Sequence, residues 1–489
     1  MKKIRIASLL FPPLGLLLLW RSDQVSLGRK IFGTVGIGLY CLPYTAAVVA
    51  LLMRFTGLEL EWRGGFPPVL TWHKTHPNFE AVEASRRAQP KTPVPPLPSN
   101  VQVDWPGFRG PHGDGHYDET AIATNWPAEG LRPIWKQPIG GGYASFAIAG
   151  GRAFTIEQRR AQEAVTAYDV ETGRELWAAA YAADFDEPLG GEGPRATPCF
   201  SEGKVYSLGA MGDFLCLDAT SGKTIWKLNI LTDNMADLLT YGTATSPLVV
   251  RDKVIVQAGG AKGRSVVAYD KLTGKVIWRV LDDGAAYASP MLVQLAGQEQ
   301  LLVVTQHRAV GLQVQDGALL WATPWIVKQG NRDNAQPVLL ATNRFLLSAG
   351  YGTGCEAVEV SRTNTGFEAQ PLWHNTWLKN KFTSSVFWQG FVYGLDEDIL
   401  VCLDAQTGER KWKDGRYGYG QVLVADGYLI VLGGEGELAL VKASPDRYEE
   451  LARFQAIEGK TWNHPAMAAG KILVRNAVQM ACFDLRAGK

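Results

Sequence analysis

Apolar and polar residues alternate in short runs along most of the chain, and many of these runs end at glycine, asparagine or aspartate. The segment "SVVAYDKLTGKVIWRV" (265–280) shows the pattern, with an alternating run on each side of an Asp-x-x-Thr-Gly turn. Alternation with a period of two is typical of β-strands. The aspartate can accept hydrogen bonds from the turn amides, and the glycine allows a positive φ. The pattern therefore predicts a β-hairpin with a tryptophan on its outgoing strand.

This hairpin recurs at intervals of 39 to 52 residues, measured from tryptophan to tryptophan. The aligned positions are Trp135, Trp177, Trp226, Trp278, Trp321, Trp373 and Trp412, with Phe454 in the eighth place. Four turns keep both the aspartate and the glycine: Asp169 with Gly173, Asp218 with Gly222, Asp270 with Gly274, and Asp404 with Gly408. Before each hairpin lies a second signature, which is a small or polar residue, a short apolar strand and a turn. Each repeat unit is therefore predicted to hold four strands.

Eight repeats of four strands predict an all-β fold, an eight-bladed β-propeller. The eighth unit reaches its turn at Asp484, which leaves no room for a fourth strand. The spare strand is at the other end of the repeats, at 131–139, where Trp135 has no preceding blade. We expect this strand to complete the last blade and close the ring, which removes exposed sheet edges. In this interpretation the repeated tryptophans are structural, and each packs against the neighbouring blade.

Three regions are predicted: a membrane anchor at 1–53, a Pro-rich linker at 54–104 and the propeller at 105–489. Within the first, residues 31–53 form an uncharged stretch long enough to span a bilayer as a helix. The stretch 6–20 is shorter and carries Pro12-Pro13, so it is expected to be a re-entrant or interfacial segment, or a short first helix. The linker ends with "PKTPVPPLPSN", which favours an extended spacer.

The charges around these segments predict the topology. With a single crossing, one group of cations lies on the same side as the amino terminus: Lys2, Lys3, Arg5, Arg21, Arg29 and Lys30. The positive-inside rule places that side in the cytoplasm, and the propeller then lies on the periplasmic side of a bacterial inner membrane. Two crossings would place it on the other side. The net charge of +1 argues against a general nucleic-acid binder.

The run Ala-x-Asp-x-x-Thr-Gly-x-x-x-Trp, clearest at 167–177 and 268–278, resembles the tryptophan-docking motif of pyrroloquinoline-quinone (PQQ)-type propellers. The segment "DWPGFRGPHGDG" (104–115) is similar to the lead-in of membrane-anchored bacterial members of that family. The resemblance implies one of two classes. One is the quinone-dependent alcohol or sugar dehydrogenases, which use PQQ and usually calcium and pass electrons to the membrane quinone pool. The other is the non-catalytic branch that includes the outer-membrane assembly scaffold BamB.

The residues favour the second class. Alcohol dehydrogenases of the family carry adjacent cysteines, and this chain has no Cys-Cys pair. The starts of the inner strands should surround the channel, where Arg195 and Lys381 could face an anionic ligand and His464 could act as a base. No carboxylate stands among these starts to bind calcium. The sequence thus predicts no catalytic residue and no metal site, and a scaffold for a protein partner in the envelope; PQQ with calcium is the alternative.

Two further segments gave local expectations. The run "HGDGH" (112–116) contains possible metal ligands, but its Gly-rich setting favours a solvated loop. The run "SPDRYEELARF" (444–454) is predicted to be a short helix that replaces the hairpin of the seventh blade.

Overall fold

A computed structural model describes residues 4, 6–8, 11–56, 58–65, 67–72, 76–98, 100–328 and 334–487. The chain divides into two compact units, Met1–Lys74 and Thr75–Lys489.

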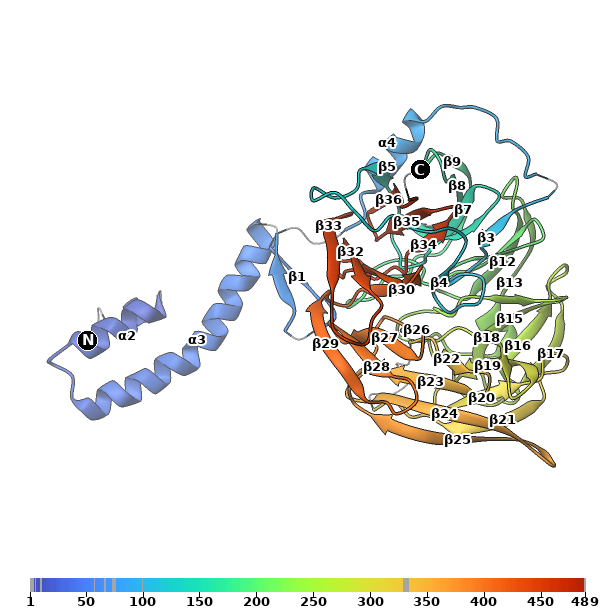
Figure 1. Ribbon diagram of the computed structural model, residues 1–489. Coiled ribbons are helices and arrows are strands. Elements are labelled where there is room, and N and C mark those ends of the chain that lie inside the picture. Colours follow the sequence, from blue (N-terminus) through green and yellow to red (C-terminus); the bar gives the residue numbers. More distant parts are fainter. Residues whose placement is uncertain are drawn as a thin grey trace. The chain divides into compact units, whose positions relative to one another are not determined.

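The first unit contains two helices, α2 (Pro12–Arg21) and α3 (Leu27–Thr56), and a hairpin of β1 (Glu59–Glu61) and β2 (Val69–Thr71). The two helices pack together through contacts such as Leu19 against Gly33 (Figure 1). The prolines 12 and 13 open α2 instead of interrupting it, because the first turn of a helix needs no amide donors. Among the described residues α3 alone is long and apolar enough to cross a membrane. Lys2, Lys3 and Arg5 lie outside the described residues.

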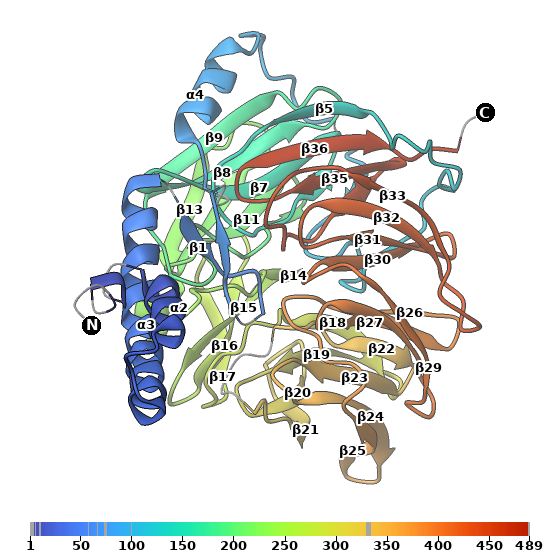
Figure 2. The same cartoon turned by 90° about the vertical axis from the view of Figure 1, so that its left-hand side faces the viewer.

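The second unit is a ring of eight sheets, each with four antiparallel strands, which confirms the predicted eight-bladed propeller (Figure 2). Blade 1 contains β6 (Ala147–Ala149), β7 (Arg152–Arg159), β8 (Gln162–Asp169) and β9 (Glu175–Ala182), and blade 2 contains β10 (Cys199–Ser201), β11 (Lys204–Leu208), β12 (Asp213–Asp218) and β13 (Thr224–Asn229). Blade 3 contains β14 (Leu248–Val250), β15 (Lys253–Gly260), β16 (Arg264–Asp270) and β17 (Val276–Val280), and blade 4 contains β18 (Met291–Leu295), β19 (Gln298–Val304), β20 (Arg308–Leu312) and β21 (Leu319–Pro324). The short helix α5 (Ile230–Asn234) follows β13.

Blade 5 contains β22 (Val338–Ala341), β23 (Arg344–Ala349), β24 (Gly354–Thr363) and β25 (Gly366–Asn375), and blade 6 contains β26 (Val386–Trp388), β27 (Phe391–Asp396), β28 (Ile399–Asp404) and β29 (Arg410–Arg416). Blade 7 contains β30 (Gln421–Ala425), β31 (Tyr428–Leu432), β32 (Glu437–Lys442) and β33 (Glu450–Gln455), and blade 8 contains β34 (Ala466–Ala468), β35 (Lys471–Arg475), β36 (Gln479–Asp484) and β5 (Pro133–Pro138). In blade 5 the outer hairpin, β24–β25, is extended to ten residues per strand. Most residues of the two middle strands in each blade are buried, as in β7, β12 and β28, and apolar clusters fill the spaces between blades.

Blade 8 is shared between the two ends of the propeller. Strand β5 pairs antiparallel with β36, and Trp135 lies opposite Cys482 (Figure 2). The predicted ring closure is therefore confirmed.

The predicted helix at 444–454 is wrong. Residues 450–455 form β33, the outer strand of blade 7, which pairs with β32 from Glu437↔Gln455 to Val441↔Glu450. Side chains along β33 alternate between partly buried and exposed positions, the period of a strand. The ladder hydrogen bonds and the packing of Phe454 against Phe483 outweigh the local helix preference.

Much of the expected linker lies along blade 1 instead of forming a free spacer. Helix α4 (Phe79–Ala88) is capped by Asn78, whose side chain accepts a hydrogen bond from the amide of Ala81. Its Arg86 donates to the carbonyl of Pro138 (2.9 Å) and pairs with Glu175 (3.1 Å). Farther along, Val94, Leu97 and Val101 pack against the apolar core of blades 1 and 2. We call residues 76–101 the strap.

Candidate functional site

The starts of the inner strands form a ring of hydrogen bonds around the channel. In five consecutive blades a side-chain oxygen accepts the backbone amide of the matching residue in the preceding blade, at 2.8–2.9 Å. The acceptors are Thr197, Ser246, Ser289, Gln336 and Ser384. All of these residues are buried. The polar side chains at the strand starts therefore join neighbouring blades to one another.

Gln421 and Ser145 complete this ring between blades 6, 7, 8 and 1. Gln421 donates to the carbonyls of Phe382 and Trp462, on the two flanking blades. The hydroxyl of Ser145 donates to the carbonyl of His464 at 2.5 Å, which joins blade 1 to blade 8.

The lead-in, residues 103–117, closes one end of the channel. Its strand β3 (Val103–Trp105) pairs with the inner strand of blade 1, and β4 (His116–Tyr117) pairs with that of blade 7. Between them Arg109, which is 1% exposed, enters the channel with a positive φ of 64°. Its guanidinium donates to the carbonyls of Ser385 (2.7 Å), Asp114 (2.8 Å) and Ser384 (3.4 Å). Burial lowers the pKa of Arg109 to about 10.

His464 is part of this closure. Its Nε2 lies 3.1 Å from Nη1 of Arg109, and its Nδ1 lies 2.7 Å from the carbonyl oxygen of Pro465. Because the guanidinium can only donate, the neutral ring carries its proton on Nδ1. Burial, together with the charge of Arg109, lowers the pKa of His464 to about 3. The role of His464 as a general base stays a prediction, and the structure places its ring in a buried contact with Arg109.

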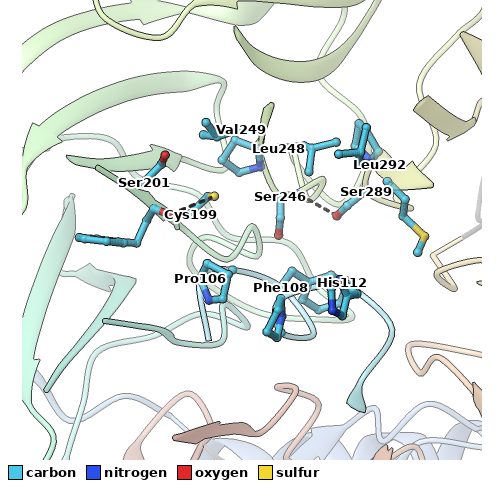
Figure 3. A pocket seen from close by; sticks show the side chains of 18 of the residues that line it. Pro106, Phe108, His112, Cys199, Ser201, Ser246, Leu248, Val249, Ser289 and Leu292 are labelled. Carbon is cyan, nitrogen blue, oxygen red and sulfur yellow. Dashed lines mark hydrogen bonds between the residues drawn. The ribbon is translucent and has the colours of Figure 1, made fainter. Parts of the chain in front are cut away.

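A cavity of about 220 Å³ lies between the lead-in and the inner strands of blades 2 to 4. Figure 3 shows Phe108 and His112 of the lead-in on one side and Ser246 and Ser289 on the other. The oxygens of both serines already accept backbone amides, and the remaining wall is largely proline, leucine, valine and methionine. Among the described residues, no lysine, arginine or carboxylate lines this cavity.

Aromatic and cationic side chains gather at the opposite end of the channel. Trp462 stacks on Phe382 (4.6 Å between ring centroids) and on Tyr143 (5.3 Å). Lys381 lies over the rings of Tyr351 (4.8 Å) and Tyr419 (5.0 Å). We call this group the aromatic layer; its members are Tyr143, Tyr351, Phe382, Tyr419 and Trp462.

Arg195 and Lys381 thus lie at the same end of the channel, as the sequence suggested, but they already have partners. Arg195 pairs with Glu187 at 2.9 Å and donates to the carbonyl of Gly193 at 2.6 Å. Its guanidinium also lies over Phe185 (4.8 Å) and over Tyr143 of the aromatic layer (5.6 Å). The sequence reading missed Lys460, which lies over Trp462 at 4.5 Å and donates to the carbonyl of Gly190 at 2.9 Å.

These residues fit a quinone cofactor with a metal ion poorly. Aromatic and cationic groups are present, but Trp462 is engaged by two other rings and Arg195 by a carboxylate. The described part of the chain contains no group of three or more His, Cys, Asp or Glu placed to hold a metal ion.

The repeated turns have the geometry that their sequence predicts. Oδ1 of Asp270 accepts hydrogen bonds from the amide (2.8 Å) and the hydroxyl (2.7 Å) of Thr273. Asp169, Asp218 and Asp404 make the same two bonds to the residue three positions later. The turn glycines adopt positive φ values, namely Gly173 (71°), Gly222 (71°), Gly274 (70°) and Gly408 (73°).

The indole N–H of five tryptophans donates to a carbonyl in the next blade. The pairs are Trp135 to Val170 (2.8 Å), Trp177 to Ala219 (3.1 Å), Trp226 to Lys271 (3.1 Å), Trp278 to Val314 (3.3 Å) and Trp412 to Ser444 (2.8 Å). Trp321 and Trp373 differ, in the blades where the motif is degenerate. Trp321 donates to Gln300 of its own blade (2.6 Å), and the buried Nε1 of Trp373 has no partner among the described residues.

The fold and these contacts define the chain as an eight-bladed propeller in which tryptophans link neighbouring blades. A sequence profile described as "Outer membrane protein assembly factor BamB" matches residues 161–414, just over half of the chain. The chain belongs to this family.

Short parts of the chain are also similar in sequence to two dehydrogenases. A lanthanide-dependent methanol dehydrogenase from Methylacidiphilum fumariolicum is 37% identical over 90 residues, and a quinohemoprotein alcohol dehydrogenase, ADH IIB, from Pseudomonas putida is 32% identical over 147 residues. These matches cover 17% and 27% of this chain, but only 14% and 20% of the relatives' own lengths.

Solved structures resemble the fold at low sequence identity. BamB from Moraxella catarrhalis has a TM-score of 0.53 at 14% identity, covering 73% of this chain and 99% of that one. The quinohemoprotein alcohol dehydrogenase ADHIIG from Pseudomonas putida also has a TM-score of 0.53 at 14% identity, covering 79% and 81%. Similarity at this level concerns the fold alone.

Proposed function

We propose that the protein is a membrane-attached binding scaffold whose propeller holds a protein partner of the cell envelope. The observation that carries this proposal is that the chain's own side chains occupy both ends of the channel. Arg109 and the lead-in close one end, and the rings of the aromatic layer stack on one another at the other. The outer surfaces of the loops and strands then remain for contact with a partner. The match to the BamB family supports the same function.

The proposed attachment to the membrane, and its orientation, rest on α3 and on the charges next to it. Arg29 and Lys30 precede its apolar stretch, and Arg54 follows it. Two cations on the amino-terminal side against one on the other favour a cytoplasmic amino terminus, and hence a propeller in the periplasm of a bacterial cell attached to the inner membrane.

In-cell cross-linking of the full-length protein tests the scaffold function. Photo-reactive residues placed at exposed positions on several blades should capture the same partner in repeated preparations from membranes. Failure of every position to capture a reproducible partner would contradict a scaffold.

A quinone-dependent dehydrogenase is the second candidate, and the sequence similarity to the methanol and alcohol dehydrogenases favours it. Arg195, Lys381 and Lys460 supply positive charge beside the aromatic layer, which suits a carboxylated aromatic ligand. The test is titration of the purified protein with PQQ and calcium, followed by dye reduction with alcohols and sugars. Stoichiometric binding that Arg195→Ala or Lys381→Ala weakens would support this candidate, and absence of binding would exclude it.

A further inference from the structure

Three neighbouring loops over blades 1 to 3 carry exposed apolar side chains. They are residues 183–195, 209–213 and 229–243. Phe185 of the first loop lies against Gly242 of the third, and the amide of Thr243 donates to the carbonyl of Ala210 in the second (2.8 Å). The exposed side chains are Leu189 (40%), Met211 (40%), Met235 (64%) and Leu238 (42%). We call the three loops together the acidic loop face, because carboxylates outnumber cations in them.

Carboxylates dominate the charge of this face. The three loops contain seven aspartate or glutamate residues and one cation, Arg195. Ion pairs occupy three of the carboxylates: Glu187 with Arg195, Asp213 with Lys227, and Asp233 with Arg279. The other four have no ion pair among the described residues, and they are Asp184, Asp186, Glu192 and Asp237.

Two of these carboxylates, Asp184 and Asp186, repel the charged form of a third, Glu192. Partial burial and then the charge of Asp186 raise the pKa of Glu192, Asp184 raises it further, and His76 opposes them. A cationic partner would relieve this repulsion on binding.

The backbone of the third loop is ordered by a capped helix. Asn229 caps α5 by accepting the amides of Leu231 and Thr232, both at 3.1 Å. Met235 ends the helix with φ +50°, a left-handed conformation in which glycine is the usual residue. The side chain at this disfavoured position is nevertheless a large and exposed methionine. Methionine is common on surfaces that bind helices of varied sequence, because its side chain is flexible and polarisable.

We propose that the acidic loop face binds a cationic amphipathic helix of the partner protein. The apolar side chains of such a helix would contact Leu189, Met211, Met235 and Leu238, and its lysines or arginines would pair with the free carboxylates. The same carboxylates disfavour anionic lipid headgroups and nucleic acid as occupants. This inference rests on the proposed scaffold function and adds the chemistry of the partner.

The propeller provides a matched control at its opposite end. Leu272 (53% exposed) and Leu319 (48%) are as accessible as the side chains of the acidic loop face. Leu272 lies in the Asp-Thr-Gly turn between Lys271, which pairs with Glu202, and Lys275, so this turn carries no excess of carboxylates.

The first test uses the full-length protein in detergent and a fluorescent synthetic helix of leucine and lysine as the probe, followed by anisotropy. We expect Asp184→Lys with Asp186→Lys, and separately Met235→Asp, each to weaken binding at least ten-fold, and Leu272→Asp to change it less than two-fold. Raising the salt from 50 to 300 mM should weaken binding to the wild type more than to the lysine variant. Equal affinities for Met235→Asp and Leu272→Asp, or no binding of the probe to the wild type, would overturn the inference. Equal thermal unfolding midpoints will show that the variants are folded.

Cross-linking in membranes separates this inference from the scaffold function. A photo-reactive residue at position 235 should capture a segment with the lysines and arginines of a cationic amphipathic helix, and one at 272 should not. If position 272 captures the partner and position 235 does not, the scaffold function stands and the acidic loop face is not its site. If neither position 235, position 272 nor any other exposed position of the propeller captures a partner, the scaffold function fails, and the inference fails with it.

Discussion

The indole N–H of Trp177 donates a hydrogen bond of 3.1 Å to the carbonyl oxygen of Ala219 in the next blade. The same indole ring lies against Gly222, at a distance where a Cβ atom would come within 2.6 Å of its carbon atoms. In the same way, Gly173 lies against Trp135, Gly274 against Trp226 and Gly408 against Trp373. The glycine of the repeated motif therefore has two functions: it allows the positive φ of the turn, and it leaves room for the tryptophan of the preceding blade.

Substitution of Gly222 by alanine should therefore destabilise the propeller more than the backbone conformation alone requires. Gly203 is a matched control, with φ +74° and no atom within 4 Å of an added Cβ. A left-handed alanine costs about 1–2 kcal/mol, and overpacking adds about 1–3 kcal/mol at Gly222. Urea unfolding followed by tryptophan fluorescence should place the midpoint of Gly222→Ala below that of Gly203→Ala. Equal midpoints would mean that the tryptophan contact contributes no stability.

His464 should make the propeller less stable at acidic pH. Burial and Arg109 lower its pKa to about 3, whereas an unfolded chain has the ordinary histidine value near 6.5. Between these values the unfolded state binds the proton and the folded state does not, so stability is lost as the pH falls below about 6.5. The slope from this residue is at most about 1.4 kcal/mol per pH unit. The variant His464→Gln should show a smaller loss of stability between pH 7 and pH 4; a curve parallel to that of the wild type would contradict the assignment.

Arg109 should hold the lead-in in the channel. The change Arg109→Ala leaves the carbonyls of Asp114, Ser384 and Ser385 without this donor, and each unpaired buried group costs about 1–3 kcal/mol. We expect a lower unfolding midpoint and protease cleavage within 105–115, detected by mass spectrometry. Arg109→Lys keeps the charge with fewer donors in a different geometry, so it should give an intermediate result. Resistance of both variants to cleavage would show that β3 and β4 hold the lead-in without the arginine.

The strap offers a test with two adjacent arginines. Arg86 contacts Glu175, Gln137, Pro138 and Tyr168 of the propeller, whereas the side chain of Arg87 is 73% exposed and lies 3.9 Å from Glu83 of its own helix. Arg86→Ala should release the strap and increase amide hydrogen exchange across residues 76–101. Arg87→Ala should leave the exchange unchanged. The same exchange in both variants would show that the apolar contacts of Val94, Leu97 and Val101 are sufficient.

The sequence predicted the propeller because its determinants are local and repeated. An Asp-Thr-Gly turn and a tryptophan at a fixed offset specify a hairpin and its contact with the next blade, and the count of strands revealed the shared last blade. The helix predicted at 444–454 was wrong because the pairing of β33 with β32 outweighed a local signal. The docked strap could not be foreseen, since its contacts join residues such as Arg86 and Glu175, far apart in the chain.

The sequence located the channel correctly, but it did not predict which groups the polar side chains of the channel bind. The polar strand starts do surround the channel, yet their oxygens accept the backbone amides of neighbouring blades. The partner that fixes the protonation of His464 is Arg109, which lies 355 positions away. No periodicity marks Arg109, and its positive φ in "GFRGP" was the one unusual feature, visible only in the structure.

The pairing of β5 with β36 has a consequence for the order in which the protein is made. Strand β5 leaves the ribosome before every blade of the propeller, but its partner, residues 479–484, is the last strand of the eighth repeat. Until residues 479–484 have been synthesised, β5 has an unpaired edge, and blade 8 cannot form. A chain that stops before residue 479 should therefore remain open and prone to pair with other unfinished chains. Closure of the ring thus requires that all eight repeats have been synthesised.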